Sequence, residues 1–261
     1  MHTALKMTAA AALTVLAAMA TPAAAVSTTF ATFSPKGGGA NIRWTNVGGN
    51  RNAAFYTTAK ANSTVPGSIQ VFFNFLQPGI GDILNNVPAL FTLNGSVTNT
   101  AATVSGATLT QSNLAGSFSF LTTAPITVAG IAFAKGANLL SGTFTGAEIT
   151  GNRNGNSATF AGSAPGSITS FTSDFLDFVG GAKVDFSFAV SSIAPTLNAL
   201  PVNGTPARAL RGFRGVAGGT FSSDPAPSSF VPEPESWAML LAGFAMIGVS
   251  LRSRRRSPVA A

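Results

Sequence analysis

Apolar and polar residues alternate along most of the chain between about residues 26 and 221. The clearest example is KVDFSFAV, residues 183–190, in which every second side chain after the lysine is large and apolar. A period of two puts these side chains on one face of a half-buried antiparallel strand. Similar runs, rich in β-branched and aromatic residues, are SIQVFFNFL, ALFTLNGSV, GSFSFL and GTFTGAEI. The pattern predicts an all-β fold, an antiparallel β-sandwich-like single domain, with short helices only at PGIGDILNN or TSDFLDF.

A glycine followed by Ser or Thr and then by an apolar residue recurs in this region, at Gly67, Gly95, Gly116, Gly142, Gly166 and Gly219. The first five are separated by 28, 21, 26 and 24 residues, about one hairpin each. Regular repetition would indicate a β-solenoid, in which each coil buries a face against its neighbours. Because the spacing drifts and nothing else repeats, we favour ordinary strand starts in a sandwich and keep the solenoid as the alternative.

The region is also long enough, at about 200 residues, for one domain with a sizeable core. Of the 21 phenylalanines in the chain, 20 lie between Phe30 and Phe230. So many aromatic side chains need an interior to pack in, which argues against disorder in spite of the low-complexity composition. We therefore assign residues 26–221 to one all-β domain, followed by a Ser- and Pro-rich linker at 222–230.

The first 25 residues have the proportions of a secretory signal peptide. Lys6 lies in a short basic region, residues 7–20 are apolar, and Ala23 and Ala25 supply the small residues of an A-x-A site. We expect cleavage after Ala25, so that the mature chain begins at Val26, with an uncleaved anchor as the alternative. Residues 1–25 are therefore left out of the fold.

The carboxyl-terminal end combines an apolar run with a cluster of arginines. Residues 237–251 carry no charge, and a helix that starts at Pro234, a residue suited to the first helical position, reaches 251 in about 18 residues. That length is enough to cross a bilayer, with Trp237 at one interface and these arginines on the cytoplasmic side: Arg252, Arg254, Arg255 and Arg256. A buried helix of a soluble core fits poorly with this cluster. We predict a transmembrane helix at about 234–251 and an extracytoplasmic β-domain.

This end of the chain resembles the PEP-CTERM sorting signal in its PEP-x-x-W-A form. The matching residues within 231–256 are Val231, Pro232, Glu233, Pro234, Trp237, Ala238 and the four arginines. The resemblance implies export in a Gram-negative bacterium, transient anchoring in the inner membrane, and recognition and cleavage by exosortase. It implies delivery to the cell surface or extracellular matrix, in association with exopolysaccharide and biofilm. The two prolines also favour an extended backbone, which a protease-like groove can hold.

Missing residue types restrict the chemistry of the mature chain. The full sequence has no Cys, and its one His, His2, lies in the predicted signal peptide, so the mature chain contains neither residue type. These absences exclude a Ser-His-Asp triad, a Cys-His pair, and metal sites built from His or thiolate. A two-carboxylate glycosidase could still be built from the acidic residues of the body: Asp82, Glu148, Asp174, Asp177, Asp185 and Asp224. We predict that the protein is not an enzyme and has no cofactor and no metal site.

Two of these carboxylates, Asp174 and Asp177, are three residues apart. On a helical turn they would share one face and could hold an oxygen-binding ion such as calcium. An N-cap at Asp174, followed by a solvated acid, is the interpretation that we favour.

The chain is basic, although charged residues make up only 9% of it. Residues 26–231 include ten basic and six acidic side chains, a net charge of +4. The only local cluster is Arg208, Arg211 and Arg214, and the aromatic residues do not surround a basic groove, which argues against nucleic acid as a partner. We interpret the cluster as a solvated loop, with contact to an anionic polysaccharide or lipopolysaccharide as the alternative.

Three functions are compatible with these features. A structural or adhesive surface protein needs only a stable, weakly charged β-domain, and it is our first hypothesis. A carbohydrate-binding module is the alternative, but it would need exposed aromatic side chains, and outside the tag the chain has one Trp and one Tyr, Trp44 and Tyr56. An extracellular glycosidase is the least favoured.

The signal peptide makes a direct prediction about processing. Amino-terminal sequencing of the exported protein should return Val26 as the first residue, because the small-residue site ends at Ala25. Recovery of Met1 would show an uncleaved anchor instead.

Overall fold

The computed structural model describes residues 27–48, 51–199, 208–229 and 240–247. The described domain is built from antiparallel strands, which confirms the prediction of an all-β, antiparallel single domain. The strands are β1 (Thr28–Pro35), β2 (Ile42–Asn46), β3 (Ala53–Thr57), β4 (Ile69–Phe75), β5 (Val87–Val97), β6 (Thr103–Ser105), β7 (Thr108–Thr122), β8 (Ile126–Val128), β9 (Ile131–Phe133), β10 (Asn138–Asn152), β11 (Ala158–Ala161), β12 (Ile168–Thr172), β13 (Leu176–Asp177), β14 (Lys183–Ala194), β15 (Phe213–Asp224) and β16 (Ser228–Ser229).

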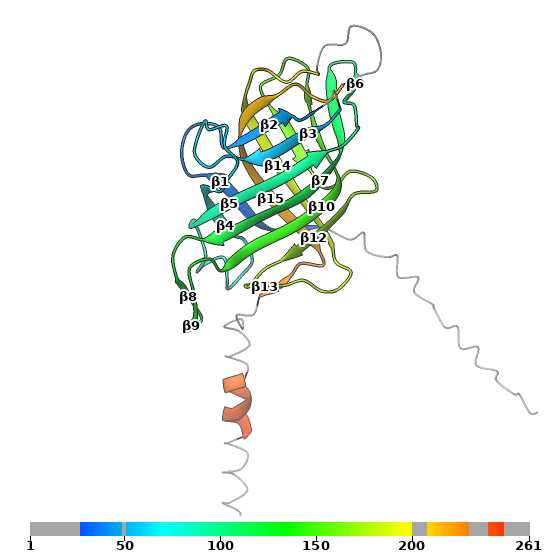
Figure 1. Cartoon of the computed structure of the whole chain (residues 1–261). Coiled ribbons are helices and arrows are strands. Elements are labelled where there is room, and N and C mark those ends of the chain that lie inside the picture. The colour runs from blue at the N-terminus through cyan, green and yellow to red at the C-terminus, as the bar shows by residue number, and fades with distance from the viewer. Residues whose placement is uncertain (1–26, 49–50, 200–207, 230–239, 248–261) are drawn as a thin grey trace, which may run out of the picture.

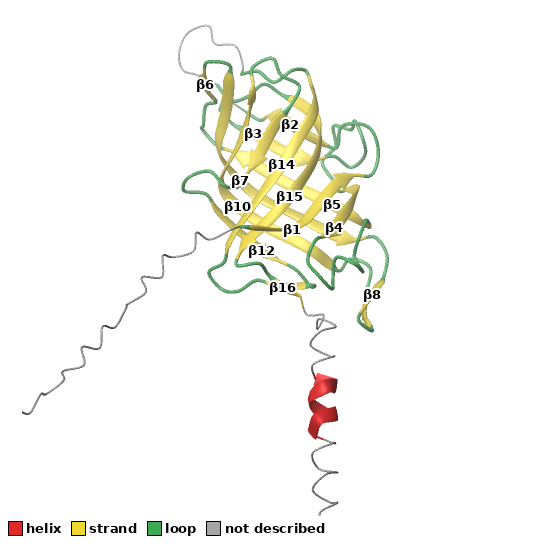
Figure 2. Cartoon of the chain, turned by 180° about the vertical axis from the view of Figure 1, so that it is seen from behind, coloured by secondary structure: helices red, strands yellow, loops and turns green. Residues whose placement is uncertain are grey.

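The main sheet closes on itself. Hydrogen bonding runs from β1 through β4, β5, β7, β10, β11, β14 and β15, and β15 pairs again with β1. Figure 1 shows β5, β7, β10 and β12 across one wall, and Figure 2, from behind, shows β14 and β15 crossing the other. The two walls face each other around one core, as the layers of a sandwich do. In a solenoid each coil would contact only its neighbours, whereas here the first strand pairs with the last long one.

Each of three long strands pairs along one of its edges with two shorter strands, one after the other. β5 pairs along the same edge with β4 and then with β3, β15 pairs with β1 and then with β2, and β10 pairs with β12 and then with β11. β2 and β3 pair with each other, so they form a second bridge between β15 and β5. The outer face of the sheet is therefore continuous from β15 through β2 and β3 to β5.

Phenylalanine fills the interior. Sixteen of the described phenylalanines are buried, and they come from both walls of the closed sheet. Phe91 and Phe120 are stacked with ring centroids 4.6 Å apart, while Phe33 and Phe188 meet edge to face at 5.0 Å. Each buried ring removes a large apolar area from water, and such paired rings add specific contacts to this gain. The alternating apolar residues of the sequence therefore face one shared aromatic core, as the pattern predicts.

Glycines make room for these rings. Gly142 lies between Phe118 and Phe171 in the register of three adjacent strands, and a Cβ on Gly142 would come within 2.5 Å of the Phe118 ring. Gly219 lies in the same way between Phe188 and Phe33, and its Cβ would meet the Phe188 ring at 2.6 Å. At both positions a ring occupies the space that a side chain would need.

This arrangement corrects our interpretation of the glycine repeat. Only Gly67 and Gly166 stand just before a strand, at the starts of β4 and β12. The other four lie inside long strands: Gly95, Gly116, Gly142 and Gly219. They do not mark strand starts: Gly142 and Gly219 leave space for aromatic rings, and Gly116 allows a close approach of the backbone of Asn94 and Gly95 on β5.

Two further expectations differ from the structure. The predicted linker at 222–230 is part of the fold for most of its length, because β15 continues to Asp224 and β16 pairs with β13. The short helices predicted at 78–86 and 172–178 are replaced by turns and by strand, respectively. In the second segment Phe175 is buried in the core. The chain beside it is extended, with Leu176 and Asp177 forming β13, and does not form a helical turn.

One helix is described, at residues 240–247, and its large apolar side chains, such as Phe244 and Met246, are exposed. Within the described ranges, no helix has both the length and the apolar character needed to cross a membrane. The predicted span at about 234–251 extends past the described residues at both ends, and the predicted signal peptide at 1–25 lies wholly outside them.

The glycine contacts predict that substitution by alanine lowers stability at Gly142 but not at Gly37. Gly142→Ala should lower the free energy of unfolding by about 1–3 kcal/mol, because the new methyl group overpacks a buried ring. Gly37→Ala is the matched control, since no atom lies within 4 Å of its added Cβ, and it should change stability by less than about 0.5 kcal/mol. Urea denaturation of both variants measures the difference, and equal effects would contradict the spacing role of Gly142.

Candidate functional site

Trp44, one of the two large aromatic residues considered as a sugar platform, lies in the core. It is 1% exposed, its Nε1 donates a 3.0 Å hydrogen bond to the Leu210 carbonyl, and its ring is parallel to that of Phe213. The next strand places Tyr56 on the outer face, where its hydroxyl donates to the Thr64 carbonyl at 3.2 Å. Only Tyr56 of the pair is therefore available to a ligand on the outside.

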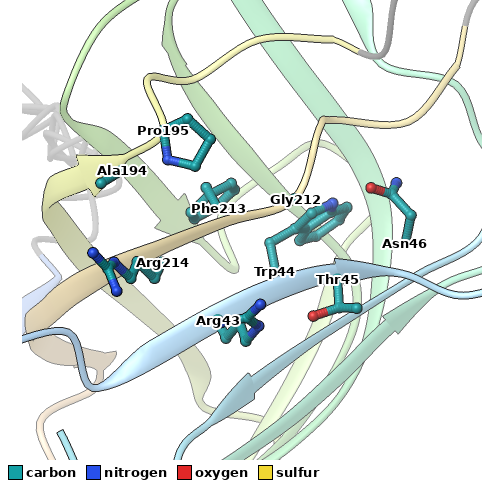
Figure 3. A pocket seen from close by; sticks show the side chains of 9 residues that line it. All are labelled: Arg43, Trp44, Thr45, Asn46, Ala194, Pro195, Gly212, Phe213 and Arg214. Carbon is teal, nitrogen blue, oxygen red and sulfur yellow. The ribbon is translucent and has the colours of Figure 1, made fainter. Parts of the chain in front are cut away.

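A pocket of about 470 Å³ opens where β2, β15 and the end of β14 meet (Figure 3). We call it the arginine pocket, and it is lined by Arg43, Trp44, Thr45, Asn46, Ala194, Pro195, Gly212, Phe213 and Arg214. Arg43 on β2 and Arg214 on β15 are direct cross-strand partners. Their neighbours along each strand, such as Trp44 and Phe213, point into the core, so the two guanidinium groups project from the outer face.

No acidic side chain lines this pocket within the described part of the chain. Neither guanidinium has a hydrogen bond or an ion pair with the part of the chain that the structure describes. Like charges directly opposite each other on an antiparallel pair reduce stability. The pair therefore carries a cost to the fold that nothing in the described surroundings offsets.

The sequence identified only part of this site. Of the predicted cluster, Arg214 lines the pocket, while Arg208 and Arg211 do not. Arg43 was missed, because it is distant from Arg214 along the chain and no local pattern links them. The signal that would have found it is the register between β2 and β15, which sequence periodicity does not report.

A second pocket, of about 320 Å³, lies on the outer face across β5, β7, β10 and β12. We call it the hydroxyl groove, and its polar side chains are Thr92, Asn94, Ser117, Ser119, Ser141, Thr143, Ser170 and Thr172. They form two rows of cross-strand partners, because Thr92 and Asn94 each begin a line of paired residues that ends on β12. The groove thus offers many uncharged hydrogen-bonding groups in a regular array.

The register joins the two pockets in one line, which we call the outer row. Its successive cross-strand partners are Arg214, Arg43, Tyr56, Asn94, Ser117, Thr143 and Ser170. All of these side chains point away from the core, since at least one neighbour of each in its strand is buried. The outer row therefore runs from a cationic end to a hydroxyl-rich end.

The carboxylates considered for catalysis or metal binding are dispersed. Asp174 accepts a 2.7 Å hydrogen bond at Oδ2 from the Asn138 amide, and Asp177 lies in β13 opposite Ser228, so the two do not share a helical turn. Among the described residues, no carboxylate lines either of the pockets described above, or a third pocket of about 300 Å³ beside Lys36. The described residues hold no group of three or more His, Cys, Asp or Glu side chains placed to bind a metal ion.

One carboxylate has an altered environment. Burial raises the pKa of Asp185 above its ordinary value of 3.8, although hydrogen bonds from the Phe186 amide and the Ser163 side chain oppose the shift. Its diagonal neighbour across the β14–β15 pair is Asp224, which lies opposite Lys183. The effect of partial burial exceeds that of the two hydrogen bonds, so the pKa of Asp185 is raised.

The predicted sorting residues lie outside the described part of the chain: Val231, Pro232, Glu233, Pro234, Trp237, Ala238, Arg252, Arg254, Arg255 and Arg256. The same holds for the predicted cleavage site at Ala23, Ala25 and Val26.

Comparison with known families bears directly on these residues. Residues 230–256 match the family model of the PEP-CTERM protein-sorting motif, which confirms the resemblance found in the sequence. Searches of curated proteins and of solved structures found no match to the chain. The motif implies export, membrane-anchored processing, and exosortase as the processing partner.

The pKa of Asp185 predicts a pH-dependent difference in stability. Because the folded pKa is raised, ionisation costs folding free energy, and this cost is absent below about pH 3.8 and grows as pH rises through the folded pKa. The free energy of unfolding of Asp185→Asn, relative to that of the unsubstituted protein, should therefore increase between pH 3 and pH 7. Chemical denaturation across this range measures it, with the exposed Asp82→Asn as a control for the lost charge. A pH-independent difference would contradict the burial effect.

Proposed function

We propose that this protein is a structural or adhesive component of the cell surface or extracellular matrix, delivered there after exosortase cleaves its sorting signal. In this proposal the β-domain associates with exopolysaccharide. Before processing, the protein is anchored transiently in the inner membrane by its carboxyl-terminal helix.

The sorting signal supports the delivery route. The motif match begins directly after β16, the last strand that the structure describes. Pro232 and Pro234 lack backbone donors and bias the preceding residues toward an extended form, which suits a segment that enters a proteolytic groove. Cleavage in this segment would release the complete domain, because its core is formed by residues further upstream.

The hydroxyl groove is the observation that carries the association with exopolysaccharide. Its Ser, Thr and Asn side chains both donate and accept hydrogen bonds, as the hydroxyl groups of a sugar polymer do. An uncharged array spread over four strands suits an extended polymer better than a compact small molecule, which a deep apolar cleft would enclose.

The proposal assigns no catalytic role to the domain. The mature chain that we predict contains no Cys and no His, and no carboxylate lines the arginine pocket or the hydroxyl groove. The domain then acts through its surface and its stability, both of which the closed sheet provides.

Substitution of the sorting signal tests the delivery route. The combined variant Pro232→Ala, Glu233→Ala and Pro234→Ala should remain folded and exported but stay in the inner-membrane fraction, because its helix is not cut off. Deletion of residues 237–261 should instead release the domain into the periplasm without surface delivery. Cell fractionation and immunoblotting, in a strain that contains exosortase, measure both destinations.

The comparison separates sorting from folding. A folding defect would cause degradation of both variants, whereas a sorting defect sends each to a different compartment. If the triple variant reached the cell surface at the level of the unsubstituted protein, the processing role of residues 232–234 would be wrong.

A further inference from the structure

We infer that the outer row binds an acidic polysaccharide, with Arg43 and Arg214 holding its carboxylate groups and the hydroxyl groove binding its sugar hydroxyls. This inference rests on the proposed association with exopolysaccharide and specifies both the surface and the chemical class of the polymer. It also gives a role to an arginine pair that the fold does not need.

The arginine pair is arranged for a carboxylate. The two residues lie on adjacent strands as direct partners, so their Cβ atoms are about 5 Å apart, and both side chains line one pocket (Figure 3). A guanidinium group binds a carboxylate through two parallel N–H donors, and such charge-assisted hydrogen bonds are stronger than neutral ones. An anion between the two groups would also remove their mutual repulsion.

The surroundings of the pair favour an anion from outside the chain. The described residues provide no partner for either guanidinium, and no Asp or Glu lines the pocket. The domain as a whole has a net charge of +4 between residues 26 and 231, so its field attracts a negatively charged polymer.

The outer row continues from the pair in the direction of the hydroxyl groove. Tyr56 is the cross-strand partner of Arg43 on one side and of Asn94 on the other, so it connects the two pockets. From β15 to β12 the row crosses six strand spacings of about 4.8 Å, or roughly 29 Å along the surface. Because the sheet closes around its core, this path is curved, and a polysaccharide chain that follows the outer face across the strands would contact the arginines and the hydroxyl groove at the same time, which a single small anion would not do.

Binding to polymers that differ in charge tests the inference. The purified full-length chain is passed over immobilised polygalacturonate, which carries a carboxylate on each sugar, and over neutral dextran. We expect binding to polygalacturonate that weakens with added salt, and at least tenfold weaker binding to dextran. The combined variant Arg43→Gln and Arg214→Gln should weaken binding to polygalacturonate by at least tenfold, because it removes two charged donors.

Two control proteins distinguish a site from general attraction. Arg153→Gln combined with Lys183→Gln removes the same net charge from exposed positions outside the pocket and should change binding by less than threefold. Arg43→Lys combined with Arg214→Lys keeps the charge but loses the paired donors of guanidinium, so it should give an intermediate loss. Thermal denaturation of the Gln variant should show no loss of stability, because the substitution relieves the repulsion between like charges.

The outcomes separate this inference from the proposed function. If the unsubstituted protein binds polygalacturonate and the arginine variant binds equally well, the site is wrong and the association with polysaccharide stands. If the exposed-charge control loses as much affinity as the arginine variant, attraction is diffuse and the site is again wrong. Equal binding to dextran overturns the acidic specificity, and no binding to either polymer overturns both the inference and the association with polysaccharide, while the sorting route keeps its own test.

Discussion

The packing of phenylalanine inside a closed sheet is the constraint on which the rest of the structure depends. Rings from facing walls meet at about 5 Å, as with Phe33 and Phe188, and an alanine in place of the neighbouring Gly219 would collide with them. The sheet can close around this core only where glycines on adjacent strands leave space. The abundance of glycine, which by composition alone could indicate a flexible chain, is here a condition of tight packing.

Closure of the sheet also creates the surface that we assign to function. Since β2 and β3 bridge β15 and β5, outward-facing residues from distant parts of the sequence become neighbours in the outer row. Strands hold such residues at fixed spacings, which positions a binding surface more accurately than loops would. The unfavourable pairing of Arg43 with Arg214 persists within this framework because the aromatic core beneath it supplies the stability.

The described core of the domain and the matched sorting motif occupy different parts of the sequence. Among the described residues, every member of the buried cluster lies before residue 230, where the matched motif begins. The buried contacts described for the domain are therefore made by residues that precede the motif. The same division explains why the motif identifies the route of the protein while the activity of the domain has to be argued from its surface.

The strands, the aromatic core and the sorting motif could be predicted from the amino-acid sequence, because each depends on local order. Alternation along KVDFSFAV, for example, places Phe186 and Phe188 on one face wherever the strand is packed. The sequence also excluded chemistry based on Cys or His by composition alone. Three contacts could be found only in the folded domain: β1 pairs with β15, Gly142 lies between two rings, and Arg43 stands beside Arg214. These contacts depend on the register between strands distant in sequence, which is set by the packing of the whole core, whereas a period of two is the same in every register.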